Sequence, residues 1–470
     1  MINWNMEQRT LNGERKMKQQ YKHLINFFAN LVTLIVEGGM FAFLWYGQYS
    51  EALEIPFYRR GNWAVIGFYV MVLFFFTHIF RGYKIGYLKT LDIIVSHILA
   101  IILSGIVGYF EITMAAHHYF PVHHVIVMMI YQMIFIIPWV FIIRKIYTSL
   151  YPPRKILLVY GEYEPKDMIK AINSRKDKYN ICGEIDCQEP DEKIFSNILR
   201  HEGVVLFDLP NDRRNRIIKF CYQNSIRVYV TPKISDIIMT AAEDIHLFDV
   251  PLLLARNSGL SLDQKFFKRI VDVVISLAGL VIALPFMLVI AACIKLYDGG
   301  PVFYKQERLT RDNKVFLIYK FRSMCVDSES QGARLAAKKD TRVTPVGNVI
   351  RNLHLDELPQ LINILKGDMS LVGPRPERPE IRDLYLEIIP EFDFRLKVKA
   401  GLTGYAQVYG KYNTTPYDKL KLDLTYIENY SLWMDFKLML MTFRILFQKD
   451  STEGIDASQM TAIRQKKGEK

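Results

Sequence analysis

Residues Ile270 to Leu296 read IVDVVISLAGLVIALPFMLVIAACIKL, a run of 27 residues that is apolar almost throughout. An α-helix of about 20 residues crosses the apolar part of a bilayer, so this segment is long enough to span a membrane. Pro285 lies near its middle, where a proline removes one backbone hydrogen bond and bends or breaks a helix. The segment is therefore either a kinked span or a helix that enters the membrane and returns to the same side.

The charges on both flanks of this segment favour the return. Basic residues stand on each side of it: Lys265, Lys268 and Arg269 before it, and Lys295, Lys305, Arg308 and Arg311 after it. Since Lys and Arg next to a membrane segment favour the cytoplasm, both ends are expected on that side. We predict a re-entrant membrane helix over 264–297, broken at Pro285 into a shallow hairpin, because irregular backbone inside a bilayer needs cover. An ordinary proline-kinked span is the alternative.

Four further apolar runs lie upstream, each close to the length of a transmembrane helix. They are roughly 24–46, 63–80, 91–114 and 122–143. Basic residues crowd the tail before the first run, the second connection and the chain after the fourth run, whereas the other two connections carry two and none. By the positive-inside rule, the N-terminus and the chain after the fourth run lie in the cytoplasm. We predict a four-span region over 1–150 in the cytoplasmic (inner) membrane, with the soluble domains in the cytoplasm.

The composition agrees with a multi-domain membrane protein. The chain has 470 residues, of which half are hydrophobic, and a formal net charge of +12. Membrane topology explains where the basic residues lie, and no basic stripe interleaved with aromatic residues stands out, so we expect no nucleic-acid binding. The five cysteines are odd in number and lack CxxC spacing, which fits a reducing cytoplasm and argues against structural zinc or a disulfide framework.

After the fourth run, the pattern changes to short apolar runs that are typical of buried parallel strands. These runs are 155–160 (KILLVY), 203–209 (GVVLFDL) and 226–231 (IRVYVT), with a helix predicted over 215–224. We predict a Rossmann-like α/β domain of doubly wound type over residues 154–250. The first strand is not followed by the G-x-G-x-x-G loop that a dinucleotide site needs, so an accessory domain without a cofactor is favoured.

The segment 298–450 is polar, rich in charged residues and punctuated by Gly and Pro, which indicates a soluble α/β domain after the membrane helix. Two short strands, near 300–304 and 314–320, are expected on either side of a polar turn. Residues 436–447 suggest a helix that lies against the bilayer, or equally a core helix. The tail 451–470 is polar and is expected to be disordered.

Inside this domain, apolar residues at helical spacing predict a helix from Asp356 to Lys366. Pro359 fits only in its first turn, where a missing N–H costs nothing. Asp356 would then stand at or next to the N-cap, where free backbone N–H groups suit a phosphate.

The adjacent acids Asp356 and Glu357 are the candidate catalytic residues. Neighbouring residues on a helix point in different directions, so we expect separate roles rather than a shared proton. An aspartate is ionised at pH 7 and can attack phosphorus without a general base. Glu357 is suited to hold a Mg²⁺ ion that neutralises a diphosphate. An ordinary helix cap is the alternative for the pair taken alone.

Basic residues of the same domain are suited to bind phosphate. Two prolines restrict the backbone of the stretch 374–376 and present Arg375 from a stiff loop, and arginine binds phosphate oxygens through two parallel hydrogen bonds. Lys320, Arg322 and Arg351 are further candidates, although each alone is better explained as a surface charge. Together with the two acids, these cations point to phosphoryl transfer at a membrane surface.

The segment resembles the bacterial sugar transferase family, the monotopic polyprenyl-phosphate glycosyl-1-phosphate transferases that prime polysaccharide and glycan assembly. The matching stretches are Tyr319–Met324 (YKFRSM), Thr344–Gly347 (TPVG), Leu355–Leu361 (LDELPQL), Leu365–Glu377 (LKGDMSLVGPRPE) and Gly401–Val408 (GLTGYAQV). The resemblance covers about residues 264–450. The four-span and α/β front end is similar to that of the larger family members, by architecture only.

The resemblance implies transfer of a sugar phosphate from a UDP-sugar to undecaprenyl phosphate, with release of UMP and with Mg²⁺ as the cofactor. It implies that Asp356 is the nucleophile of a covalent intermediate, that Glu357 is linked to the metal, that Arg375 binds phosphate, and that Pro285 breaks the re-entrant helix. Glucose or galactose is the expected sugar, for an exopolysaccharide or capsule, and membrane lipid is an expected partner. The sequence leaves open whether the chain forms a homodimer.

Two alternatives remain at this point. The chain departs from the family pattern at four positions: Thr310 and Asn313 replace glycines, Ala400 replaces proline, and Lys411 replaces arginine. These changes give some support to a non-catalytic membrane scaffold or sensor with a degenerate transferase domain, although they leave the acid pair untouched. The second alternative is direct transfer between the substrates without a covalent intermediate.

Overall fold

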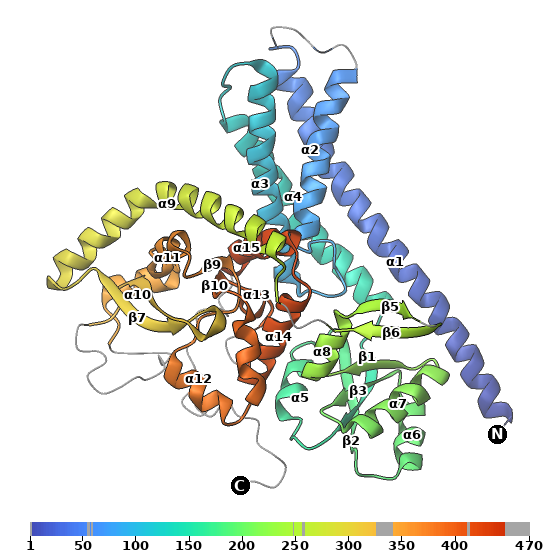
Figure 1. Ribbon diagram of the computed structural model, residues 1–470. Helices are drawn as coiled ribbons and strands as arrows, with labels where there is room; N and C mark the ends of the chain where they lie inside the picture. The colour runs from blue at the N-terminus through green and yellow to red at the C-terminus, as the bar shows by residue number, and fades with distance from the viewer. Residues whose placement is uncertain are drawn as a thin grey trace. The chain divides into compact units, whose positions relative to one another are not determined.

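The computed structural model describes residues 2–53, 57, 60–247, 249–255, 259–325, 342–410 and 414–446 (Figure 1). The predicted tail 451–470 and Lys411 lie outside these ranges. The chain forms two compact units, which divide between Thr231 and Pro232. In the described part, five helices are long and apolar enough to cross a membrane, four in the first unit and one in the second. This agrees with the predicted membrane protein.

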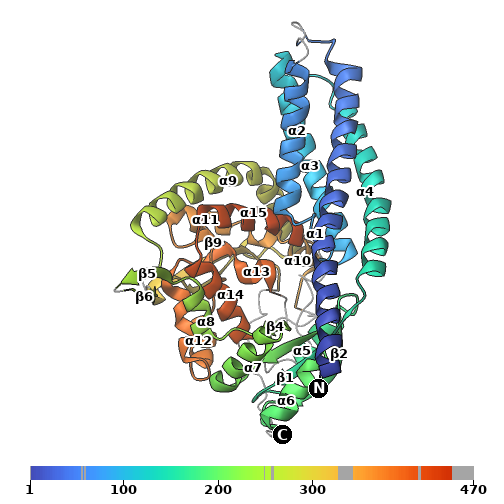
Figure 2. The ribbon, with the colours of Figure 1, turned by 90° about the vertical axis from the view of Figure 1, so that its right-hand side faces the viewer.

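The first four helices match the four predicted spans. α1 (Ile2–Leu44) continues into the π-helical turn Trp45–Tyr49, and α2 (Arg60–Ile79), α3 (Thr90–Ala116) and α4 (His123–Leu150) follow. α1 and α3 each pack on both α2 and α4, so the four helices form a closed bundle (Figures 1 and 2). Aliphatic and aromatic side chains fill its interior, and many others are exposed on the outside, as expected of helices that contact lipid.

The α/β domain of the first unit contacts one end of this bundle. Arg144 near the end of α4 donates hydrogen bonds to the carboxylate of Asp177 at 2.6 Å and to the carbonyl of Leu88 at 2.8 Å. Leu88 belongs to the second connection, which the charge pattern assigned to the same side of the membrane as Arg144. The contacts therefore agree with the alternation of sides that the positive-inside rule predicts.

A parallel sheet forms the centre of the α/β domain. Its strand order is β2-β1-β3-β4, with β1 (Arg154–Tyr160), β2 (Tyr179–Asp186), β3 (Gly203–Phe207) and β4 (Arg227–Val230). The sequence predicted β1, β3 and β4 but missed β2. β2 is an edge strand with alternating burial, so it lacks the continuous apolar run that marks a strand buried on both faces.

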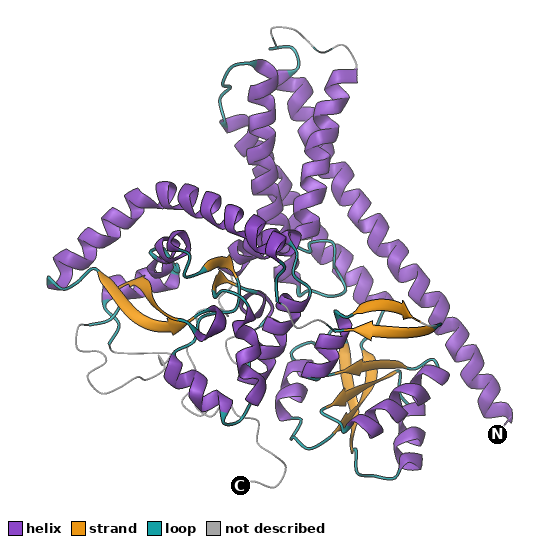
Figure 3. Ribbon diagram, viewed as in Figure 1, coloured by secondary structure: helices purple, strands orange, loops and turns teal. Residues whose placement is uncertain are grey.

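Helices cover both faces of this sheet (Figure 3). α6 (Asp191–Leu199) and α7 (Asn211–Gln223) pack on one face, against Leu157 and Val159. α5 (Lys166–Asn173) packs on the other face, against the alternate residues of β1. Since successive side chains of a strand point to opposite faces, β1 is buried on both. The sheet is thus a parallel α/β sheet with helices on both faces.

The end of the predicted range 154–250 belongs to the second compact unit. α8 (Ile234–Thr240) packs two buried isoleucines against α14 (Pro416–Glu428) of the soluble domain. The antiparallel hairpin of β5 (Glu243–Leu247) and β6 (Val250–Leu254) follows α8. The sheet ends with β4, and the chain then contributes to the core of the next domain.

α9 (Leu262–Asp298) is one continuous helix of 37 residues, and the predicted break at Pro285 is wrong. The helix curves in Figure 1 and lies along the soluble domain of its own unit. A proline removes one hydrogen bond and crowds the preceding turn, but the flanking turns remain helical here, so the chain bends instead of forming a hairpin. Large apolar side chains on its outer face are exposed, such as Val281 at 67% and Phe286 at 62%.

The soluble domain of the second unit contains two small sheets. One is the antiparallel pair β7 (Phe303–Leu309) and β8 (Val315–Phe321), and the other is the parallel pair β9 (Ser370–Val372) and β10 (Gly401–Thr403). β8 matches the predicted strand 314–320, whereas the strand predicted near 300–304 was placed too early and overlaps β7 only at its start. The remaining helices are α10 (Pro345–Asn352), α11 (Gln360–Lys366), α12 (Pro379–Leu386), α13 (Tyr405–Tyr409) and α15 (Leu432–Leu446). Three 3-10 turns connect them: η2 (Arg311–Asn313), η3 (Leu355–Glu357) and η4 (Pro390–Lys397).

α15 has a buried side and an exposed side, so its packing supports the core helix, and its contact with the bilayer stays a prediction. Leu438 is buried in the core of the domain, whereas Trp433 and Phe443 are exposed. A buried ion pair of 2.5 Å between Lys268 and Asp435 joins the first turns of α9 to α15. The membrane helix is thereby bound into the interior of the soluble domain.

Candidate active site

The two candidate acids lie in the 3-10 turn η3, and not in the first turn of the helix that the sequence predicted. α11 begins only at Gln360, with Pro359 at its N-cap. Pro359 has no N–H to donate to the carbonyl of Leu355, and the N–H of Leu358 donates to that carbonyl instead at 3.3 Å. The predicted helix 356–366 is therefore too long by one turn, and the acids precede it.

Two cations converge on one carboxylate oxygen of Glu357. Lys320 Nζ lies 2.9 Å from Glu357 Oε1, and Arg375 Nη2 lies 2.8 Å from the same atom. Lys320 is in β8 and Arg375 is in the loop after β9, so three separate segments meet here. Burial alone would raise the pKa of Glu357, but the charges of Arg375 and Lys320 outweigh burial and hold it well below its usual value. Glu357 is therefore a carboxylate under working conditions.

Asp356 experiences the opposite electrostatic effect. Burial raises its pKa, and the negative charge of Glu357 raises it further, while Lys320, Arg351 and His354 offset part of this increase. His354, which the sequence did not single out, begins η3 in a left-handed backbone conformation with φ 55°. Asp356 is thus a carboxylate with little solvation beside several cations.

A buried asparagine holds the segments of Lys320 and Glu357 together. Asn363 of α11 accepts a hydrogen bond from the N–H of Tyr319 at 2.9 Å and donates one to the carbonyl of Leu317 at 2.7 Å. Both partners are backbone groups of β8. The Asn363 side chain therefore satisfies hydrogen-bonding groups at this edge of β8, as a neighbouring strand would. The distance between β8 and α11, and hence between Lys320 and Glu357, depends on these two bonds.

The structure brings three of the four predicted cations to the acid pair and gives the fourth another partner. Lys320 and Arg375 contact Glu357, and the charge of Arg351 acts on Asp356. The Arg322 guanidinium is buried and forms an ion pair with Asp298 at the end of α9. Arg322 therefore connects β8 to the membrane helix.

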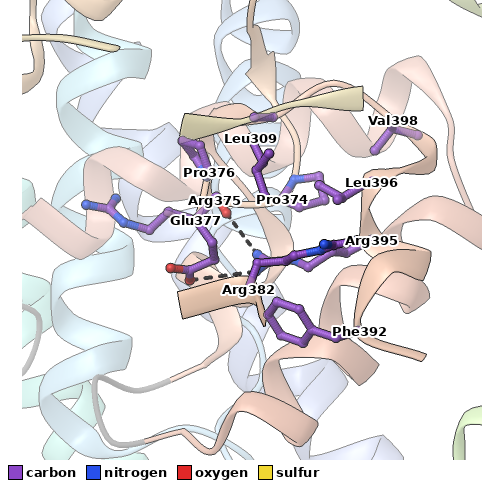
Figure 4. Close-up of a pocket in the computed structure, with 11 residues that line it drawn as sticks. Leu309, Pro374, Arg375, Pro376, Glu377, Arg382, Phe392, Arg395, Leu396 and Val398 are labelled. Atoms are coloured by element: carbon purple, nitrogen blue, oxygen red, sulfur yellow. Dashed lines mark hydrogen bonds and ion pairs between the residues drawn. The ribbon is translucent and has the colours of Figure 1, made fainter. Parts of the chain in front are cut away.

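Two arginines, the buried Arg395 and the half-buried Arg308, support the Pro-Arg-Pro loop (residues 374–376). Arg395 Nη2 donates to the carbonyl of Arg375 at 2.9 Å, and Arg308 Nη1 donates to the carbonyl of Pro376 at 3.1 Å. Figure 4 shows Arg395 reaching that carbonyl and the carboxylate of Glu377, which lies 3.6 Å away. The loop that presents Arg375 is therefore fixed by hydrogen bonds as well as by its prolines.

Arg395 is in turn anchored by Asp423 of α14, at 2.8 Å. The two side chains are 4% and 1% exposed. Burial, partly offset by the charge of Arg395, raises the pKa of Asp423 to about 6. No sequence signal marks this pair, because its members lie far apart in the chain and belong to no shared motif.

Two glycines allow the backbone segments around the loop to approach closely. A Cβ on Gly401 would lie 2.1 Å from the backbone nitrogen of Gly373. The N–H of Gly401 donates to the carbonyl of Pro374 at 2.9 Å, and the N–H of Gly373 donates to the carbonyl of Thr403 at 2.8 Å. These contacts explain why both positions are glycines.

The acid residues fit a Mg²⁺ site that the substrate completes. The described residues hold no cluster of three His, Cys, Asp or Glu side chains suited to a metal. Mg²⁺ is commonly bound by one or two carboxylates together with substrate phosphates and water. Glu357 Oε1 is engaged by two cations, which leaves Glu357 Oε2 and Asp356 as carboxylate donors beside a bound diphosphate.

Comparison with known proteins agrees with this geometry. The family described as bacterial sugar transferase matches residues 263–449. The UDP-N-acetylgalactosamine-undecaprenyl-phosphate N-acetylgalactosaminephosphotransferase of Aeromonas hydrophila is 36% identical over 301 residues, 63% of this chain and 67% of that protein. The chain belongs to the bacterial sugar transferase family.

Other relatives of this bacterial sugar transferase carry different sugars in their names. The UDP-glucose:undecaprenyl-phosphate glucose-1-phosphate transferase of Xanthomonas campestris is 34% identical, over 56% of each chain. The undecaprenyl-phosphate galactose phosphotransferase of Salmonella typhimurium is 38% identical, over 43% of this chain and 45% of that protein. The matched region thus covers about half the length of each of these two relatives.

Two departures of this bacterial sugar transferase from the family pattern compensate each other. Thr310 Oγ1 accepts a hydrogen bond from the N–H of Ala400 at 3.2 Å and donates one to the carbonyl of Asp368 at 2.8 Å. A glycine at 310 would lack the hydroxyl, and a proline at 400 would lack the N–H. Asn313, another departure, has φ 59°, a conformation that glycine adopts freely and asparagine tolerates.

Proposed function

We propose that this bacterial sugar transferase moves a sugar-1-phosphate from a UDP-sugar to undecaprenyl phosphate and releases UMP, the first step in assembling a polysaccharide or glycan. The observation that carries the proposal is the meeting of Lys320 and Arg375 at Glu357, next to the half-buried Asp356. The relatives described above, whose names state a UDP-sugar or an undecaprenyl-phosphate acceptor, support it.

In the first step, a carboxylate oxygen of Asp356 attacks the β-phosphorus of the UDP-sugar. The bond from that phosphorus to the bridging oxygen breaks, and UMP leaves with the electron pair. A sugar-phosphoryl group remains on Asp356. Lys320, Arg351 and Arg375 bind the diphosphate oxygens, which lowers the repulsion that an anionic nucleophile meets.

In the second step, a phosphate oxygen of undecaprenyl phosphate attacks the same phosphorus. The acyl phosphate bond breaks, Asp356 regains its carboxylate, and the product is a lipid-linked diphosphate sugar. Neither step needs a general base, because both attacking groups are already anions at neutral pH.

In this proposal Glu357 aligns two cations and would also hold Mg²⁺. It aligns the side chains of Lys320 and Arg375, which donate to the same oxygen. When bound beside the diphosphate, Mg²⁺ supplies neutralisation of the charge that develops on the departing UMP.

The proposed topology keeps the site in the cytoplasm, where UDP-sugars are made. α9 enters and leaves the same face of the inner membrane in this arrangement, which its bend and the basic residues on both flanks support. Its inner face packs on β8, α10 and η3 through Phe321, Ile350 and Leu355. The site is then held at headgroup depth, within reach of a lipid phosphate.

The test is release of UMP from UDP-sugars by membranes that contain the full chain, with and without Mg²⁺. We expect release that requires Mg²⁺ and that Asp356→Asn abolishes. Asp312→Asn, at an exposed turn outside the site, is the matched control and should retain release. Unchanged turnover in Asp356→Asn contradicts the proposal, and no release with any UDP-sugar favours a scaffold.

The covalent step requires a separate experiment. A UDP-sugar labelled in its β-phosphate is mixed with the chain before any lipid acceptor is added. Label that stays on the wild-type protein, and that undecaprenyl phosphate removes, supports the aspartyl intermediate. Direct transfer between the two substrates predicts no labelled protein.

The sugar is to be identified by screening. We expect glucose or galactose, and the names of the relatives add N-acetylgalactosamine. A panel of these UDP-sugars and UDP-N-acetylglucosamine, compared by kcat/KM for UMP release, distinguishes them.

A further inference from the structure

A cavity of about 430 Å³ opens beside the first turns of α9. Its lining is strongly basic and includes six cations: Lys265, Lys268, Arg269, Arg311, Lys397 and Lys399. Asp272 is the single acid among the described residues that line it. A recess with this balance concentrates positive potential and attracts anions. We call it the basic cavity.

Three of the six cations already have carboxylate partners. Lys268 pairs with Asp435, Arg311 with Asp312 and Lys397 with Glu428, at 2.5, 3.1 and 4.0 Å respectively. Lys265, Arg269 and Lys399 have no carboxylate partner within the described ranges. Asp272 Oδ1 accepts hydrogen bonds from Ser370 Oγ at 3.0 Å and from the N–H of Leu371 at 2.9 Å, so one negative charge faces the three cations without an ion pair to any of them.

Lys399 shows the cost of this crowding. Burial lowers its pKa, and the charges of Arg269 and Arg311 lower it further, while Asp272 and Asp368 offset part of this decrease. An ammonium group in this position is disfavoured unless an anion binds near it. The cavity is therefore built to accept negative charge from outside the chain.

Apolar side chains at the rim indicate where that anion comes from. Leu262 and Phe266 line the basic cavity and are 84% and 62% exposed. They begin the helix whose next turns expose Ile270 and Val274. Cations beside exposed apolar residues at the start of a membrane helix are typical of the headgroup region, where a lipid presents a phosphate above its acyl chains.

The basic cavity is distinct from the catalytic site. Arg269 donates to the carbonyls of Ile364 and Leu365 at the C-terminal end of α11, at 2.5 and 2.7 Å. Glu357 lies before the N-terminal end of that helix. α11 has seven residues and is therefore about 10 Å long, so the two sites lie at opposite ends of it.

We propose that the basic cavity binds the phosphate of an anionic membrane phospholipid and so holds the first turns of α9 at the headgroup level. Lys265 and Lys399 are the residues that bind it, and Arg269 lines the same cavity. The undecaprenyl phosphate carrier offers a similar phosphate on a lipid, and the test below separates the two sources. The inference does not depend on the proposed transfer reaction.

The test uses the full chain purified in a neutral detergent, with phosphatidylglycerol as the probe. Binding is followed by native mass spectrometry and by the rise in unfolding temperature as lipid is added. The test variant is Lys265→Gln/Lys399→Gln, and the control is Lys295→Gln/Lys314→Gln, which removes two positive charges outside the cavity. Wild type and control should bind phosphatidylglycerol alike, and the test variant should bind it about tenfold more weakly or worse.

Further arms make the result decisive. Phosphatidylcholine should give no comparable rise in unfolding temperature. Without lipid, the test variant should unfold at or above the wild-type temperature, because two crowded charges are gone. Equal phosphatidylglycerol binding by wild type and test variant overturns the proposal, and so does a test variant that unfolds well below wild type without lipid. A lysine dependence seen only for undecaprenyl phosphate, or an equal rise with inorganic phosphate, also overturns it.

Discussion

At the scale of single residues, Asp356 and Glu357 are neighbours with opposite electrostatics. Both are partly buried, but Glu357 receives direct hydrogen bonds from two cations, whereas Asp356 faces the charge of Glu357. Glu357 is thereby fixed as a carboxylate, and Asp356 has the higher affinity for a proton. This difference fits one structural acid and one reactive acid better than a shared proton.

The raised pKa of Asp356 predicts the pH dependence of the reaction. Asp356 reacts as a carboxylate, so kcat/KM for UMP release should fall when the pH drops through its pKa. The charge of Arg351 lowers that pKa, and Arg351→Gln should therefore move the acid limb to higher pH and reduce kcat/KM. Lys314→Gln, a change at an exposed position, should leave the limb in place. An unmoved limb in Arg351→Gln would show that Asp356 does not control it.

The pair Arg395 and Asp423 predicts a separation of stability from activity. Arg395→Met should destabilise the protein by about 3–5 kcal/mol, because it leaves the buried Asp423 unpaired. Arg395→Met/Asp423→Leu should recover most of the unfolding temperature but not UMP release, since the carbonyl of Arg375 still lacks its donor. Full activity in the stable double variant would mean that Arg395 serves the fold alone.

Sequence motifs marked the residues proposed to react, but not the residues that support them. Asp356, Glu357 and Arg375 stand in short stretches whose residue types suit phosphate chemistry. Arg395 and Asp423 contact only protein, and their role depends on chain segments that meet in the fold. Arg322 was predicted to bind phosphate because it shares the charge and the motif of Lys320. In the structure Lys320 pairs with Glu357, whereas Arg322 pairs with Asp298.

At the scale of secondary structure elements, Asn363 connects α11 to β8. It makes two backbone hydrogen bonds to β8 while fully buried. We predict that Asn363→Leu lowers the free energy of unfolding by about 2–4 kcal/mol, because two buried backbone groups lose their partner. Asn348→Leu, at an exposed position of α10, is the control in a chemical unfolding experiment. Equal stability of the two variants would contradict the role of Asn363.

Elements were predicted where one pattern dominates and missed where two effects compete. The buried strands β1 and β3 have continuous apolar runs, but the edge strand β2 does not. The start of α11 was predicted too early because apolar residues keep helical spacing through η3. The regular helix cannot extend back through η3, because Pro359 has no N–H to donate. In α9, the propensity of the flanking apolar turns prevails over Pro285, and the helix bends.

At the scale of the whole molecule, the topology is open to direct test. In a background with the exposed cysteines Cys182, Cys293 and Cys325 changed to serine, single cysteines are placed at Tyr119 and Leu353. A thiol reagent that cannot cross the membrane should label Tyr119→Cys in intact cells, because the positive-inside rule places the third connection outside. Leu353→Cys should react only after lysis. Labelling of Leu353→Cys in intact cells would place the catalytic domain on the outer side.

Domain organisation followed from composition, but the boundary between the units did not. The four spans and the soluble segments differ clearly in hydropathy. Residues 232–254 follow an α/β sheet in sequence, yet α8 buries its isoleucines against α14 in the second unit. The unit against which α8 packs depends on which surface offers a matching apolar patch, and the local sequence does not show this.

The first turns of α9 have a practical consequence for anyone who wishes to simplify this enzyme. Lys268, Arg269 and Asp272 reach from the membrane segment to α15, to the end of α11 and to β9. A fragment that starts at Gly299 would lack these three side chains, so α15, α11 and β9 would each lose a charged partner. The first turns of α9 are therefore part of the interior of the soluble domain. A water-soluble version of the protein would require a redesigned interior.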